Sequence, residues 1–132
     1  MRVRRVRARF TAVLAAMALM LSGLLIGSAP GAQAAVVPIA YYDAYAGDQS
    51  QTISVAAPGI LANDFGVNAA YVAKLISSNI WDGSTLTVNT DGSFAFHPAA
   101  GLSGQNMFHY CLALRVGNGD CVSNIEEVDL FV

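Results

Sequence analysis

The sequence is poor in the side chains that most often carry chemistry. Its 132 residues include only two histidines and two cysteines. A histidine acts as a general base when a nucleophile or a carboxylate is held against it. His97 ends an alternating run, and His109 points away from Phe108 and Tyr110 because side chains alternate along a strand. Ser103, in Gly-Leu-Ser-Gly, does not match the G-x-S-x-G nucleophile motif. We therefore expect a protein that is not an enzyme.

Helical periodicity is also missing, and period-two alternation takes its place. The clearest stretch is residues 83–110, which reads GSTLTVNTDGSFAFHPAAGLSGQNMFHY. Apolar residues alternate with polar ones in 86–88 and again in 94–96. Between these arms lies Asp91-Gly92, a pair that tolerates the positive φ of a tight turn. The stretch predicts a β-hairpin followed by a third strand.

The same pattern extends over most of the chain and predicts about seven short strands. These are expected at residues 39–46, 52–55, 71–76, 86–88, 94–96, 107–114 and 126–132, with residues 77–83 as a loop that holds Trp81. Short strands separated by frequent turn residues are typical of an all-β, Ig-like antiparallel β-sandwich. A small β-barrel is the competing fold.

Basic residues are scarce except at the N-terminus, where five of the seven precede Phe10. An apolar run of 17 residues, 10–26, follows, and Ala32-Gln33-Ala34 ends the segment. A basic head, an apolar middle and an A-x-A end predict a cleaved secretory signal peptide at residues 1–34. An uncleaved membrane anchor is the alternative, because the run reaches the short limit for a membrane span. We expect a secreted domain, residues 35–132, in the medium or at the cell envelope, with membrane contact only through an uncleaved signal peptide.

The predicted domain is acidic. It keeps two basic side chains, Lys74 and Arg115, against nine acidic ones, a formal net charge of −7. This charge argues against nucleic acid and anionic lipid as partners. Three acids lie close together near the last strand, and two of them are expected to point outward and discourage edge pairing; they are Glu126, Glu127 and Asp129.

The two cysteines, Cys111 and Cys121, lie in the exported part of the chain, with nine residues between them. Export to an oxidising compartment favours a disulfide bond, which would join the two C-terminal strands. A loop this short gives a stabilisation of about 2–3 kcal/mol in the chain-entropy account. A redox or metal site is the alternative, but the chain has no C-x-x-C spacing.

Several segments together resemble a known family. Residues 57–64 (APGILAND), 83–98 and 101–104 (GLSG), with Phe108 and Tyr110, resemble the bacterial Ig-like and cadherin-like repeats of large secreted and surface proteins. The resemblance covers about residues 41–132, as a single copy. It implies a non-catalytic module that presents a surface for adhesion or protein–protein contact, with an extracellular protein or a polysaccharide as the unidentified partner.

Ligand binding is the alternative function. Relatives in this family often carry an acidic run after Asn-Asp, but here Asn63-Asp64 is followed by Phe-Gly-Val-Asn. Calcium takes six to eight oxygen ligands, so no cofactor is expected; Asp43 and Asp64 are the weak metal candidates, with turn capping as the other reading for both. Trp81, Tyr41 and Tyr42 are candidates for an aromatic face that binds a glycan, although aromatic residues in a small sandwich usually belong to the core.

Overall fold

Seven strands and one short 3-10 helix make up the part of the chain that the structure describes. The structure is a computed structural model that describes residues 35–132, so the predicted signal peptide lies outside it. The elements are β1 (Asp43–Ala46), β2 (Ile53–Val55), η1 (Gly59–Leu61), β3 (Tyr71–Asn79), β4 (Thr85–Val88), β5 (Phe94–His97), β6 (Gln105–Leu114) and β7 (Glu126–Phe131).

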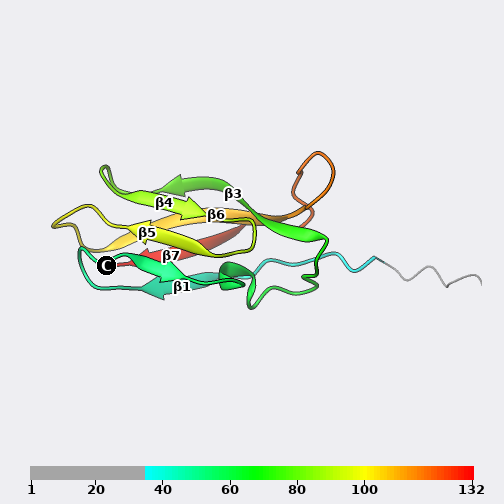
Figure 1. Cartoon of the computed structure of the whole chain (residues 1–132), viewed down its shortest axis with the longest axis horizontal. Helices are drawn as coiled ribbons and strands as arrows, with labels where there is room; N and C mark the ends of the chain where they lie inside the picture. The colour runs from blue at the N-terminus through cyan, green and yellow to red at the C-terminus, as the bar shows by residue number, and fades with distance from the viewer. Residues whose placement is uncertain (1–34) are drawn as a thin grey trace, which may run out of the picture. The chain divides into compact units, whose positions relative to one another are not determined.

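The strands form two sheets that pack as a sandwich, which confirms the predicted all-β fold (Figure 1). One sheet has the order β1-β7-β6-β3, and the other has the order β2-β5-β4. The predicted arrangement was antiparallel throughout, but β1 pairs with β7 in parallel. The expectation that acids on the last strand protect a sheet edge was wrong, because β7 lies between β1 and β6.

The core lies between the sheets and follows the alternation of the strands. β6 contributes Phe108 and Tyr110, and β5 contributes Phe94 and Phe96, all almost fully buried. The ring of Phe94 contacts the rings of Tyr45 and Phe108 edge-on, with centroids 5.0 and 5.5 Å apart. Burying each such side chain contributes about 1.5–3 kcal/mol, so these aromatic residues hold the two sheets together.

The predicted hairpin forms between β4 and β5, and its turn touches η1. Gly92 has φ +85°, as the Asp-Gly turn predicted. The carboxylate of Asp91 accepts hydrogen bonds from the backbone N–H and the hydroxyl of Ser93. A Cβ atom on Gly92 would lie 2.0 Å from the carbonyl oxygen of Pro58. Glycine is therefore required here both for the backbone angle and for the close approach of two chain segments.

Strand β3 is longer than the sequence indicated. The prediction ended it near Ile76, but the strand continues to Asn79 after an irregularity in register between Leu75 and Ser77. The extra residues are polar and have low strand propensity, yet they pair with the apolar strand β6. Tertiary pairing thus overrides the local preference.

The predicted disulfide between Cys111 and Cys121 is present, with the two Cα atoms 5.7 Å apart. Cys121 precedes β7 and makes an isolated bridge to Ala113, so the bond joins β6 to the β6–β7 loop, not directly to β7. This loop projects from one end of the domain (orange in Figure 1). A disulfide indicates an oxidising, extracytoplasmic location.

Candidate functional site

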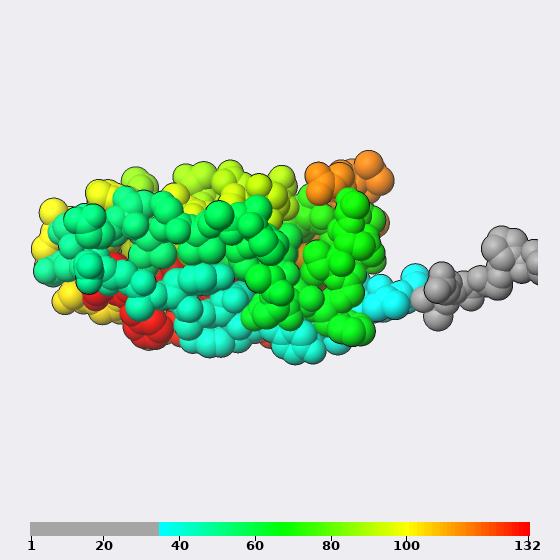
Figure 2. All heavy atoms as spheres, turned by 60° about the horizontal axis from the view of Figure 1, so that its bottom comes forward, coloured from blue at the N-terminus to red at the C-terminus, as the bar shows by residue number. Residues whose placement is uncertain are grey.

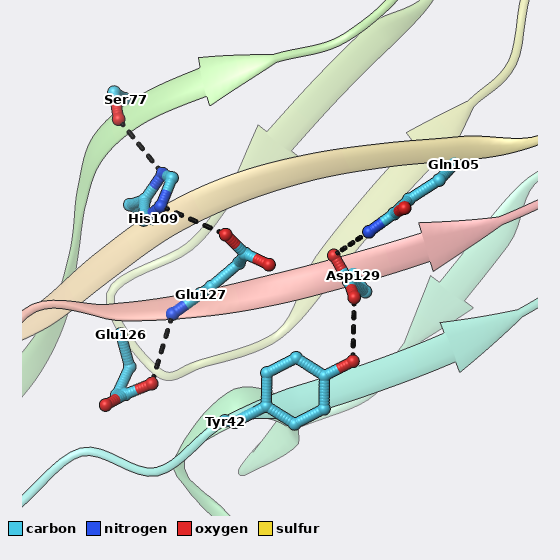
Figure 3. Close-up of polar contacts among 7 residues, drawn as sticks. All are labelled: Tyr42, Ser77, Gln105, His109, Glu126, Glu127 and Asp129. Carbon is cyan, nitrogen blue, oxygen red and sulfur yellow. Dashed lines mark hydrogen bonds and ion pairs between the residues drawn. The ribbon is translucent and has the colours of Figure 1, made fainter.

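Polar side chains gather on the outer surface of the four-stranded sheet (Figure 3). Alternation along β6 and β7 sends the core residues inward and their neighbours outward, as the burial of Phe108 and Val128 shows. We call this outward group the polar face; its members are Tyr42, Ser77, Gln105, His109, Glu127 and Asp129. It draws on all four strands of the sheet or on residues directly beside them.

The first cluster on the polar face is centred on Asp129. The hydroxyl of Tyr42 donates to Oδ2 of Asp129 at 2.7 Å, and Nε2 of Gln105 donates to Oδ1 at 2.7 Å. These bonds, that of Tyr42 first, hold the pKa of Asp129 below its ordinary value. The same bond raises the pKa of Tyr42. Asp129 is only 6% exposed, whereas Tyr42 is 50% exposed, so a fixed carboxylate anchors a tyrosine ring that solvent can reach.

The second cluster joins three strands through His109. Its Nδ1 lies 3.3 Å from the hydroxyl of Ser77, and its Nε2 lies 3.4 Å from Oε2 of Glu127. A hydroxyl, an imidazole and a carboxylate in a row are also the parts of a nucleophilic site. Here they lie on a strand surface, and the side chains of His109 and Glu127 are 35% and 36% exposed. No partner for His109 was predicted, because its contact with Glu127 depends on the β6–β7 register, in which the two residues are opposite each other.

No hollow accompanies these clusters. Residues 35–132 enclose no detectable pocket. Figure 2 shows a second view, in which the N-terminal half of the domain (cyan to green) forms a closed surface without a deep cleft. The polar face is thus an open surface on the four-stranded sheet.

The structure brings the two metal candidates together on the inner side of the same sheet. Oδ1 of Asp64 accepts hydrogen bonds from the backbone N–H of Tyr41 and the hydroxyl of Tyr110, each at 2.8 Å. Oδ1 of Asp43 accepts one from Nδ2 of Asn63 at 3.3 Å. Oδ2 of each aspartate is buried and has no hydrogen-bond partner in the part of the chain that the structure describes. Two carboxylates with unpaired buried oxygens are costly to keep charged.

The pKa values of this pair follow from that burial. Burial first, and then the charge of Asp64, raise the pKa of Asp43 to about 6. Burial also raises the pKa of Asp64, against the effect of its two hydrogen bonds. Among residues 35–132, no group of three or more His, Cys, Asp or Glu is arranged to hold a metal ion. The pair offers two free carboxylate oxygens, which falls short of a full calcium sphere.

The aromatic candidates do not meet. Trp81 follows β3, and Tyr42 precedes β1, at opposite edges of the four-stranded sheet. Trp81 is partly buried; its backbone N–H donates to Oδ1 of Asn106 at 2.9 Å, and its ring lies against Gly104. Tyr41, at 47% exposure, holds Asp64 through its backbone N–H. A ligand role for these residues stays a prediction, and no surface joins all three.

Comparisons with known proteins give no relative: no family model matches the chain, and no curated protein is significantly similar to it. The described residues also contain no helix that is long and apolar enough to cross a bilayer. What is established is a small all-β domain of two packed sheets that carries one disulfide.

Proposed function

We propose that this chain is a secreted, non-catalytic Ig-like module, and that it works by presenting the polar face to a partner at the cell envelope or outside the cell. The observation that carries this proposal is the network of side-chain contacts on the polar face. Tyr42 and Gln105 each donate a 2.7 Å hydrogen bond to Asp129, and His109 lies between Ser77 and Glu127. Side chains held in place before contact lose less conformational entropy on binding. The polar face can therefore bind a partner with little ordering of its own side chains.

The resemblance to bacterial Ig-like and cadherin-like repeats supports the same function. Those repeats serve as spacers or adhesive modules, and this chain carries a single copy of the pattern. The sandwich fold and the disulfide agree with an exported module. The partner is an extracellular protein or a polysaccharide, and the exposed ring of Tyr42 beside hydrogen-bonding groups is compatible with either.

The test is binding of the exported, disulfide-intact protein to a panel of peptidoglycan, polysaccharides and matrix proteins. A double variant, His109→Ala with Glu127→Ala, removes both partners of the 3.4 Å contact together, so that neither side chain is left without the other. We expect at least a roughly tenfold weaker interaction for this variant, equivalent to about 1.4 kcal/mol. Equal binding by the variant and the unmodified protein would count against the polar face.

Cation binding at Asp43 and Asp64 is the second candidate. It is favoured by one observation, the unpaired buried Oδ2 atoms of both residues. A cation would pair with both oxygens and would stabilise the folded state by mass action. A melting temperature that rises with millimolar calcium in the unmodified protein, and not in Asp43→Asn, would support this candidate. An unchanged melting temperature would exclude it.

A further inference from the structure

One of the four sheet edges differs from the others in length. The strands at the edges are β1, β3, β2 and β4. Three of them have three or four residues, whereas β3 has nine. Short edge strands are a common protection against pairing with another chain. Strand β3 lacks this protection; its one irregularity is the shift in register between Leu75 and Ser77, which leaves Ser77, Ser78 and Asn79 paired with β6.

The outer edge of β3 also carries backbone groups without partners. Near its start, the N–H of Ala73 donates to the carbonyl oxygen of Thr90, so this part is covered. Within residues 35–132, the structure records no backbone hydrogen bond from Lys74 to Asn79 apart from those to β6 within the sheet. The free part of the edge is therefore residues 74–79.

The orientation of one residue in this segment follows from the register. The carbonyl oxygen of Leu112 accepts the N–H of Val122, on the side of β6 away from β3. Backbone groups alternate along a strand, so Phe108 also directs its N–H and C=O away from β3. Ser78 is opposite Phe108 and therefore directs its own N–H and C=O to the free edge.

The side chains of the free edge suit contact with another strand. All six residues are exposed, including Leu75 and Ile76 at 40% and 39%. The segment contains no proline and no acidic residue, and its single charge is that of Lys74. The other edge of the same sheet begins at the acidic residue Asp43.

We propose that the outer edge of β3, residues 74–79, is an association surface that pairs with the same edge of a second copy of this chain. The net charge of −7 for residues 35–132 opposes contact between copies over most of the surface. Residues 74–79 contain no carboxylate, so pairing two of these segments brings none of their side chains into like-charge contact between acids. Pairing about a twofold axis makes the two β3 strands antiparallel, and the same edge of each copy then forms the interface. Main-chain hydrogen bonds supply the affinity, as in other strand additions.

The expected dimer is weak. Six residues on each side cover less than the roughly 1,200 Å² that marks the lower end of stable interfaces. We therefore expect a dissociation constant on the order of 10–100 μM. Dimerisation through β3 leaves β1 and β7, and so most of the polar face, free for another partner.

The experiment is sedimentation velocity of the exported, disulfide-intact protein from about 5 μM to about 1 mM, a range that brackets the expected dissociation constant. We expect the mean mass to rise from monomer toward dimer.

Ser78→Pro removes an N–H that β6 does not use, and proline is tolerated at a strand edge. Ile76→Lys places like charges across the twofold axis. Each variant should weaken association at least tenfold, whereas the control Val116→Lys, at a residue 77% exposed in the β6–β7 loop, should not.

Amide hydrogen exchange supplies a second readout that does not depend on any variant. The N–H of Ser78 should exchange more slowly at the high protein concentration than at the low one. The N–H of Ala73, already bonded to Thr90, should show little change. A monomer at every concentration, or a dimer that both edge variants leave intact, would overturn the proposal. A variant that is unfolded by circular dichroism is set aside, and the other variant and the exchange measurement then decide.

Discussion

Tyr42 and Asp129 join strand β7 to the segment that leads into β1, through a hydrogen bond of 2.7 Å from the tyrosine hydroxyl to the carboxylate. The bond crosses the parallel pair of strands in the sheet. It also lowers the pKa of Asp129 and raises that of Tyr42. A single contact thus fixes the tyrosine ring on the polar face and keeps its anchor charged at neutral pH.

Replacing Tyr42 with phenylalanine should raise the pKa of Asp129 toward its ordinary value. A carboxylate with a lowered pKa stabilises the fold above its unfolded value, near 3.9, and loses this contribution as the pH falls through the folded value. The variant should therefore lose less stability between about pH 4 and pH 2 than the unmodified protein. Carbon-detected NMR titration of the Asp129 carboxyl checks this shift directly. An unchanged pKa in Tyr42→Phe would show that the hydrogen bond is not its main cause.

Asp43 should give the opposite pH dependence. Its pKa is raised to about 6, so the folded state disfavours its charged form. The stabilisation from the neutral form is fully present below the unfolded pKa, near 3.9, and is lost as the pH rises through about 6. Asp43→Asn should be more stable than the unmodified protein at pH 7.5, with the difference shrinking toward pH 4. Melting temperatures across this range provide the measurement; parallel curves for the two proteins would contradict the raised pKa.

The disulfide should stabilise the folded state because it restricts the conformations of the unfolded chain. Replacing Cys111 and Cys121 together with serine should lower the free energy of unfolding by about 2–3 kcal/mol in the chain-entropy account. Urea unfolding of the oxidised protein and of the double variant measures this difference. Equal stability would mean that the β6–β7 loop is ordered by other contacts, such as the hydrogen bond from Nζ of Lys74 to the carbonyl oxygen of Gly119.

Gly92→Ala tests the contact between the hairpin turn and η1. The added Cβ would lie 2.0 Å from the carbonyl oxygen of Pro58, and the backbone would keep a φ of +85°. Strain of this kind costs on the order of 1–3 kcal/mol, and the clash adds to it. Gly101→Ala is the matched control, because Gly101 also has a positive φ but has no neighbour within 4 Å of the added atom. Similar losses in both variants would mean that the backbone angle alone, without the close approach, determines the cost.

The elements of the fold could be predicted because their signals are local. Alternation and turn residues located all seven strands, although the first was predicted over residues 39–46 and β1 begins only at Asp43. The Asp91-Gly92 turn has the positive φ that its sequence indicated. Which strands pair with each other in the sheets could not be predicted from such local signals. Nothing near β1 shows that it lies parallel to β7, since that choice depends on the packing of residues more than 80 positions apart. The end of β3 was missed for the same reason.

The candidate site was predicted only in part. The sequence singled out Asp43 and Asp64 by motif, and the structure adds that each has a buried oxygen without a partner. The polar face was not foreseen, because it depends on which residues of β6 and β7 are opposite each other. His109 and Glu127 are 18 positions apart in the chain and meet only through this register.

If the polar face makes the functional contact, cells that carry the partner should bind the protein through this face. Fluorescently labelled exported protein would be titrated onto intact cells of the producing organism, beside two double variants. One is His109→Ala with Glu127→Ala, on the polar face. The other is Ser54→Ala with Thr87→Ala, two exposed residues on β2 and β4 of the opposite sheet. We predict that the first variant loses binding and that the second binds like the unmodified protein; binding that survives in the first and is lost in the second would contradict the account.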